Sequence, residues 1–159
     1  MTTVNAIAVF DDKKIQGTVR FTQHPDHHVV TIDIDVKGLK RGQKHGFHVH
    51  QYGDMSDHCT SMCDHFNPYE KTHGGPLSKT RHVGDLGNLH ADATGRARCS
   101  ITDAQIRLTG TARNIIGRGL IIHEGEDDLG MGGNELSKKT GNAGARIACA
   151  VIGYARPVA

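Results

Sequence analysis

The feature that most constrains the fold is a short-range alternation of apolar and polar residues, without helical periodicity of useful length anywhere in the chain. The segment TIDIDV (31–36) shows it most clearly, because every second residue is apolar, the period of a half-buried strand. Further strand-like segments are 6–10, 18–21, 46–50, 97–101, 105–109, 120–123 and 146–154. The pattern predicts an all-β chain of short strands.

Two long stretches interrupt this pattern. Residues 51–88 and 124–143 lose the alternation and are rich in Gly and Asp, with several His in the first stretch. Aperiodic stretches of this length in a compact domain are usually functional or disordered. The chain has 159 residues, a length typical of one domain with its own core. We therefore expect a single domain, residues 1–159, forming an antiparallel sandwich or barrel with two functional loops.

Charge and hydropathy exclude several classes of partner. The net charge of +2 and the isoelectric point near 8.4 are too small for a protein that binds nucleic acid or a membrane surface. No apolar run approaches the roughly 18 residues of a spanning helix, and the first residues lack the pattern of a secretory signal. The expectation is a cytoplasmic protein with no nucleic-acid partner and no membrane association.

Histidines are unusually numerous, at 12, and are spread along the chain. His48 and His50 are two residues apart on a predicted strand, so their side chains should share one face. Such a pair alone is a weak signal for metal. His123 ends an apolar segment and, taken alone, is better explained as a histidine of the core.

The first loop adds a more specific set of donors, consisting of His65, His73, His82 and Asp85. Three imidazole nitrogens and one carboxylate oxygen complete a tetrahedral zinc site. The alternative is a polar loop that contains histidines by chance.

Six motifs carry a resemblance to a known family. They are GFHVH (46–50), HFNP (65–68), KTHGGP (71–76), RHVGDLGN (81–88), HE with DDLG (123–130) and GNAGARIAC (141–149). In order and spacing they resemble the copper/zinc superoxide dismutases, from about residue 6 to about residue 155. The resemblance implies a Greek-key antiparallel β-sandwich or flattened barrel of immunoglobulin-like type.

The resemblance also implies which residues hold each metal. Copper would be held by His48, His50, His65 and His123, and zinc by His65, His73, His82 and Asp85. Because His65 stands in both sets, it would bridge the two metals. Asp127 resembles the carboxylate that links His48 to His73 outside the metals.

The implied activity is that of an oxidoreductase. Superoxide would be converted to dioxygen and hydrogen peroxide by one-electron cycling of copper, with zinc in a structural role. His65 would exchange a proton, and Arg146 would dock the superoxide anion. Glu135 and Lys139 correspond to charges that steer the substrate, and Lys138 adds a further positive charge. Many family members carry a lysine where Gly125 stands here and an acid where Leu136 stands.

Four cysteines allow three fully paired connectivities. The resemblance selects Cys59–Cys149, a disulfide that would be unusual for a cytosolic protein, and leaves Cys63 and Cys99 unpaired. Three interpretations of Cys63 are open: it is inert, it competes with Cys59 for the disulfide, or it binds stray metal.

Assembly is also inferred from the resemblance. Ile116, Ile152 and Tyr154 lie where family members form a twofold homodimer, and a copper chaperone is a further expected partner.

Two other functions are alternatives. One is a copper carrier, buffer or decoy of the same fold without turnover, but such relatives typically lose a copper ligand or the arginine. The other is a zinc hydrolase, which needs an open zinc position and a general base. All the expected ligands and Arg146 are present here, and three histidines with an aspartate close the zinc site.

Overall fold

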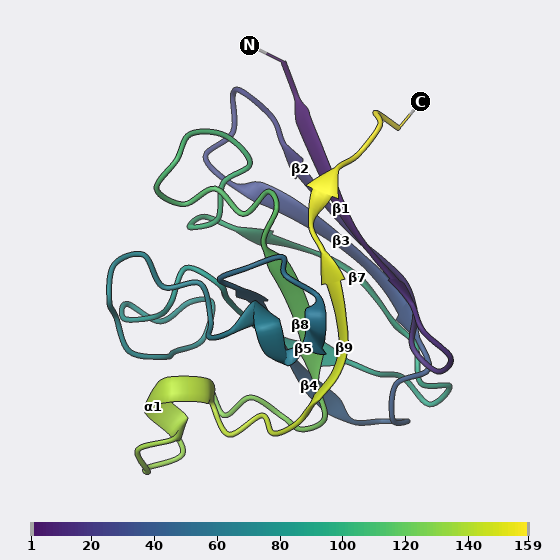
Figure 1. Cartoon of the computed structure of the whole chain (residues 1–159), viewed down its shortest axis with the longest axis vertical. Coiled ribbons are helices and arrows are strands. Elements are labelled where there is room, and N and C mark those ends of the chain that lie inside the picture. Colours follow the sequence, from purple (N-terminus) through teal and green to yellow (C-terminus); the bar gives the residue numbers. More distant parts are fainter. Residues whose placement is uncertain (1, 159) are drawn as a thin grey trace.

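The computed structural model of the protein describes residues 2–158 as two antiparallel sheets packed face to face (Figure 1). The five-stranded sheet has the order β10-β1-β2-β3-β7, with β1 (Val4–Asp11), β2 (Gln16–Gln23), β3 (Val30–Lys37), β7 (Ala97–Asp103) and β10 (Gly153–Tyr154). The four-stranded sheet has the order β6-β4-β8-β9, with β4 (Lys44–His50), β6 (Asp85–His90), β8 (Gly119–His123) and β9 (Arg146–Val151).

The chain changes sheet after β3, β6, β7 and β9. Neighbours such as β3 with β7, or β4 with β8, are therefore distant in sequence, which is a Greek-key arrangement. The two sheets remain separate and do not close into a barrel. The predicted antiparallel β-sandwich is confirmed.

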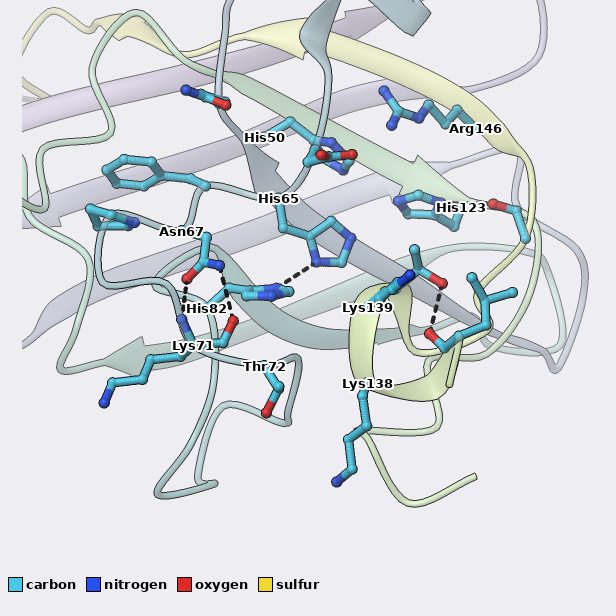
Figure 2. A pocket seen from close by; sticks show the side chains of 17 residues that line it. His50, His65, Asn67, Lys71, Thr72, His82, His123, Lys138, Lys139 and Arg146 are labelled. Atoms are coloured by element: carbon cyan, nitrogen blue, oxygen red, sulfur yellow. Dashed lines mark hydrogen bonds between the residues drawn. The ribbon is translucent and has the colours of Figure 1, made fainter. Parts of the chain in front are cut away.

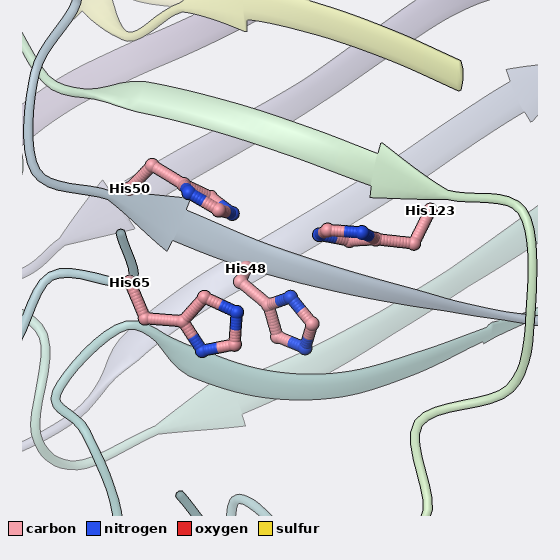
Figure 3. Close-up of side chains that lie close together, drawn as sticks. All are labelled: His48, His50, His65 and His123. Carbon is pink, nitrogen blue, oxygen red and sulfur yellow. The ribbon is translucent and has the colours of Figure 1, made fainter. Parts of the chain in front are cut away.

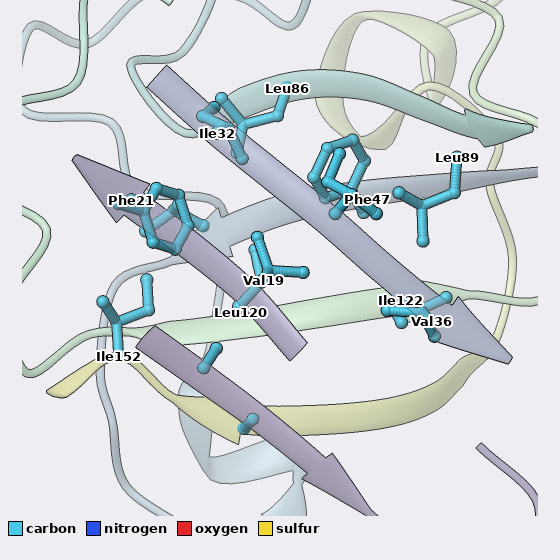
Figure 4. Close-up of a cluster of buried hydrophobic side chains, with 14 of the residues drawn as sticks. Val19, Phe21, Ile32, Val36, Phe47, Leu86, Leu89, Leu120, Ile122 and Ile152 are labelled. Atoms are coloured by element: carbon cyan, nitrogen blue, oxygen red, sulfur yellow. The ribbon is translucent and has the colours of Figure 1, made fainter. Parts of the chain in front are cut away.

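The core lies between the two sheets (Figure 4). Val19, Phe21 and Ile32 enter it from the larger sheet, and Phe47 and Leu120 enter it from the smaller one; all five are fully buried. Strand β3 follows the predicted period of two, since its apolar residues are buried and the residues between them are half-buried or exposed. Burial of these alternating faces is the main force that holds the sheets together.

Several expected boundaries are wrong. Residues 105–109 form no strand; Ile106 and Leu108 are buried in a turn-rich segment that has only one isolated bridge, Arg107 with Asn114. The apolar content of that segment therefore reports burial and not strand pairing. The stretch 51–88 is not wholly irregular, because it contains β5 (Ser56–Cys59), the 3₁₀ turn η1 (Thr60–Met62) and the first residues of β6.

The last predicted strand, 146–154, is also divided. Its residues pair in different sheets on either side of the fully buried Ile152, as β9 and β10.

The two long loops meet beside the smaller sheet (Figure 1). The second loop carries the short helix α1 (Ser137–Thr140), and the backbone of Lys138 there accepts a hydrogen bond from His73 N of the first loop at 2.8 Å. A buried ion pair between Arg81 and Asp103, 2.7 Å from Nη1 to Oδ1, fastens the first loop to the end of β7. No helix within residues 2–158 has the length and apolar character needed to span a membrane.

A disulfide joins Cys59 at the end of β5 to Cys149 in β9, with the two Cα atoms 5.6 Å apart. Cys63 and Cys99 are free and exposed. The disulfide closes a loop of 90 residues and fixes the first long loop to the smaller sheet.

We predict that Cys149→Ser lowers the free energy of unfolding of the metal-free protein by about 4–5 kcal/mol, the loop-closure entropy of so long a loop. Denaturant unfolding measures this change, with Cys99→Ser as the matched control at an exposed position, expected to shift stability by less than about 0.5 kcal/mol. Non-reducing peptide mapping should find Cys59 linked to Cys149. A Cys63–Cys149 peptide, or equal destabilisation by the two variants, would contradict the assignment.

Candidate metal centre

The first group of donors is built on two neighbouring strands. On β4, Phe47 and Val49 lie in the core, so His48 and His50 project from the opposite face of the strand toward the loops. His123 is the last residue of β8, which pairs with β4, and His65 enters from the first loop (Figure 3). Donor atoms of these four histidines lie within 4.8 Å of one another, and all four residues are buried. We call them the first cluster.

A second cluster consists of His65, His73, His82 and Asp85. One carboxylate oxygen, Asp85 Oδ1, lies 2.9 Å from His65 Nδ1, 3.0 Å from His73 Nδ1 and 3.1 Å from His82 Nδ1. The other oxygen, Oδ2, accepts hydrogen bonds from the backbone N–H groups of Gly74 and His82, at 3.0 and 2.8 Å. His65 belongs to both clusters, so the two predicted donor sets come together around one shared ring.

Four buried ring nitrogens face these clusters without an aligned hydrogen bond: His48 Nδ1, His50 Nε2, His123 Nε2 and His73 Nδ1, which lies 3.0 Å from Asp85 Oδ1. The other nitrogen of each ring is held firmly. It bonds to Asp127 in His48 and His73, to the carbonyl of Cys63 in His50 and to the carbonyl of Gly144 in His123.

Buried polar atoms are seldom left unpaired. A ring fixed through one nitrogen, with the other aimed at a common point, is the usual arrangement of a metal-binding histidine. These residues therefore fit a pair of metal ions.

The first cluster holds its imidazoles in the neutral form. Burial lowers the pKa of His48 and His50 well below the usual value, and the neighbouring histidines lower it further. Burial also lowers the pKa of His123, to about 4, although its hydrogen bond to Gly144 opposes the shift. Only neutral imidazole has a lone pair for a metal, so this cluster is ready to bind at neutral pH.

The second cluster pairs an ionised carboxylate with a protonated imidazole. Burial raises the pKa of Asp85, but its close contacts with His65, His73 and His82 outweigh burial and hold that pKa far below the usual range. Burial lowers the pKa of His73, yet its hydrogen bond to Asp127 and its contact with Asp85 outweigh this effect and raise it to about 9. The metal-free chain thus gathers positive charge around a buried carboxylate, a place that a divalent cation can take.

Asp127 links the two clusters through the ring nitrogens that point away from them. Its oxygens lie 2.7 Å from His48 Nε2 and 2.7 Å from His73 Nε2, and the residue is buried. Asn88 fixes its backbone from both sides: Asp127 N donates to Asn88 Oδ1 at 2.8 Å, and Asn88 Nδ2 donates to the carbonyl of Asp127 at 3.0 Å.

Gly141, at the end of α1 with φ of 73°, leaves room for this carboxylate. A Cβ there would overlap Asp127 Oδ1 and His73 Nε2. Asn88 and Gly141 both lie in the family motifs, but residue type alone assigns them no role, because each acts through its place beside Asp127.

Arg146, half-buried at the start of β9, lines a cavity of about 800 Å³ that opens above His50, His65, His82 and His123 (Figure 2). Its guanidinium donates to the carbonyls of Cys59 at 2.8 Å and Cys63 at 2.6 Å. Burial lowers the pKa of Arg146, but an arginine starts so high that it stays charged.

The Cys63 carbonyl also orients His50, through a hydrogen bond of 2.7 Å to Nδ1. The backbone of Cys63 therefore has a positioning role that was not foreseen from its thiol, and the φ of 61° there is unusual for a residue other than glycine.

Positive charges surround the mouth of the cavity. Lys71, Lys138 and Lys139 line it with Arg146, and Asp64 is the one acidic residue in its lining. Of the predicted steering residues, Lys139 lies on the cavity, whereas Glu135 does not line it and contacts Lys139 at 3.7 Å on the exposed surface of the second loop. Lys71 was not foreseen, because nothing in the sequence places the middle of the first loop at this mouth.

Comparison with known proteins supports one family. The family model for copper/zinc superoxide dismutase matches residues 15–152. A superoxide dismutase [Cu-Zn] of Paramecium bursaria Chlorella virus 1 is 56% identical over 153 residues, which cover 96% of this chain and 80% of the relative. The superoxide dismutase [Cu-Zn] of Yarrowia lipolytica is 50% identical over 151 residues, covering 94% of this chain and 97% of the relative.

Among solved structures, the crystal structure of the clock protein EA4 superposes with a TM-score of 0.92 at 44% identity, covering 98% of this chain and 97% of that one. The matched segment contains every residue of both donor clusters as well as Arg146. On the family match and the identity of these relatives, the chain belongs to the copper/zinc superoxide dismutase family.

Proposed function

We propose that this protein is a superoxide dismutase. In the reaction, one superoxide anion gives up an electron and leaves as dioxygen, and a second accepts that electron with two protons and leaves as hydrogen peroxide. The observation that carries the proposal is the pair of clusters that share His65, with unpartnered ring nitrogens directed at both.

The first cluster would hold copper, and the second would hold zinc. Four imidazoles suit copper, whereas three imidazoles and a carboxylate form the closed tetrahedral set that zinc prefers. When bound, copper supplies the one-electron couple, and zinc, which has no redox chemistry, supplies fixed charge and structure. The closed donor set of the second cluster also argues against a zinc hydrolase.

His65 is the residue placed to move a proton. Its Nδ1 faces Asp85 in the second cluster at 2.9 Å, which leaves Nε2 for the first cluster. The ring borders the cavity (Figure 2), so a proton held at Nε2 can pass to an oxygen species that enters there. The second proton comes from solvent.

Arg146 would dock the anion. Its two backbone hydrogen bonds, to Cys59 and Cys63, hold the guanidinium in place before substrate arrives. A fixed, permanently charged group of this kind orients a small anion beside His123 and His65. The presence of Arg146 with the complete first cluster favours turnover over a carrier, buffer or decoy of the same fold.

A homodimer is the assembly we propose, formed through an apolar face beside β1 and β9. Val9, Tyr52, Val151 and Tyr154 expose 55%, 49%, 40% and 72% of their surface. Tyr154 pairs with Ala6 of β1, and Val9 of the same strand borders one cavity with Val151. A Cβ at Gly53, the residue after Tyr52, would lie 3.1 Å from Val151. A second copy of the chain would cover this surface.

Of the three residues expected at this interface, Tyr154 is exposed and Ile116 is half-buried, but Ile152 is fully buried and cannot offer its side chain to a partner. Copper loading by a chaperone protein is a further proposal. It is supported by the depth of the first cluster: His50, His65 and His123 border the cavity but are almost wholly buried, and His48 has no exposed surface, so a hydrated ion must shed water to reach the four donors.

The division of ligands predicts metal-specific losses. We expect His123→Ala to weaken copper binding at least about tenfold while zinc stays bound, because no donor of the second cluster is changed. Asp85→Ala should weaken zinc binding first. Metal analysis of both purified variants, beside His90→Ala as an exposed control, measures this, and equal loss of both metals in His123→Ala would refute the division.

Steering of superoxide by charge is a known property of superoxide dismutases; here Lys139 and Arg146, which line the cavity, would carry it. Activity should fall as ionic strength rises toward about 0.15 M, where the screening length is about 8 Å. Lys139→Gln should lower the rate and flatten this dependence, and Arg146→Gln should lower it further because docking is lost too. Glu135→Gln should raise the rate at low salt.

Stopped-flow decay of superoxide across salt concentrations is the measurement for these variants. Lys37→Gln, on an exposed strand end of the other sheet, removes the same charge far from the mouth and is the matched control. A parent rate that does not change with salt, or equal effects of Lys37→Gln and Lys139→Gln, would exclude steering by this mouth.

A further inference from the structure

A tight turn between β2 and β3 contains two histidines that are not part of the metal centre. His27 N donates to the carbonyl of His24 at 3.1 Å and closes the turn, and Pro25 occupies its second position, where its fixed φ is favourable. Asp26 N donates to His24 Nδ1 at 3.3 Å. The backbone thus holds residues 24 and 27 at the two ends of one turn.

The rings of His24 and His27 lie together on the surface. Their centroids are 4.6 Å apart with 32° between the planes, and both residues are exposed. Across the chain that the structure describes, no other pair of exposed histidines has its rings in contact.

The turn is anchored at its start by Gln23. The side chain of Gln23 accepts from Leu108 N at 2.7 Å and donates to Thr109 Oγ1 at 2.8 Å. The two rings are therefore brought together by an ordered turn and not by a freely moving tail.

We propose that His24 and His27 form a surface site for a divalent transition metal and that this site binds Cu²⁺ most tightly. Two imidazole nitrogens that bond one ion at about 2.0–2.1 Å must approach to about 3–4 Å, and the two rings are exposed with their centroids already 4.6 Å apart. Imidazole suits copper, nickel and zinc, and among divalent ions of the first row copper binds most strongly. Neither histidine belongs to the two buried clusters.

Asp26 supports this chemistry. Its Oδ2 lies 3.8 Å from His24 Nδ1. When His24 Nε2 gives its lone pair to the metal, the ring proton resides on Nδ1, and the carboxylate can accept it as a hydrogen bond. This exchange replaces the long bond from Asp26 N with the carboxylate–histidine–metal arrangement common in metal sites. Water would complete the coordination, so binding is exchangeable, unlike that of the buried centre.

The test uses protein already loaded with copper and zinc, whose metal content is measured first. Added Cu²⁺ should then bind to one further equivalent per chain in equilibrium dialysis, with a second Cu²⁺ signal in electron paramagnetic resonance. The double variant His24→Gln/His27→Gln should lose this equivalent, and Asp26→Asn should bind it about tenfold more weakly. The control His58→Gln/His90→Gln removes the same number of exposed histidines and should keep it.

Absence of the further equivalent in the parent protein would overturn the proposal, as would its persistence in the His24→Gln/His27→Gln protein or its equal loss in the control. The experiment counts the Cu²⁺ ions bound in excess of the metal content measured at the start, and it does not use enzyme activity. The proposed dismutase function and the surface site can therefore fail independently of each other.

Discussion

The centre of this protein depends on one imidazole ring that two sets of donors must share. His65 contributes to both clusters, so each metal site is complete only if the ring lies in one particular position between them. Asp127 reinforces the same constraint from the other side, because its two oxygens hold His48 of the first cluster and His73 of the second. A shift in either loop would therefore disturb both sites together, and the two clusters form a single unit.

The sandwich makes this arrangement possible by giving the loops a rigid base. Strand β4 packs Phe47 and Val49 into the core and thereby fixes His48 and His50 on its other face. The first loop packs a few apolar side chains, Phe66 and Val83 among them, against the core. The loops are further ordered by the disulfide between Cys59 and Cys149, the buried pair of Arg81 and Asp103, and the hydrogen bonds around Asp127. Metal binding would add to these contacts, since the unpartnered ring nitrogens gain a ligand only when ions are present.

Most of the fold could be predicted from residue alternation, which identified β3 and the shared face of His48 and His50. It failed at residues 105–109, where apolar side chains are buried without strand pairing, and at Ile152, where a short run passes from one sheet to the other. The donor clusters and Asp127 were foreseen through family motifs, but the other residues that orient the donors were not. The Cys63 carbonyl and the space at Gly141 are backbone features, and the Asn88 side chain binds the backbone of Asp127, so residue type alone does not reveal these roles. The homodimer, the chaperone and the cytoplasmic location stay predictions.

The most direct test of the shared ring is magnetic. With Cu²⁺ placed in both clusters, an imidazolate of His65 bonded to both ions would couple their unpaired electrons, as a single bridging ring allows. We predict an electron paramagnetic resonance intensity well below that expected from the copper content, which returns toward the full value when acid protonates the ring and releases it from one ion. Two independent Cu²⁺ signals that together account for all the bound copper at neutral pH would contradict the claim that His65 serves both clusters.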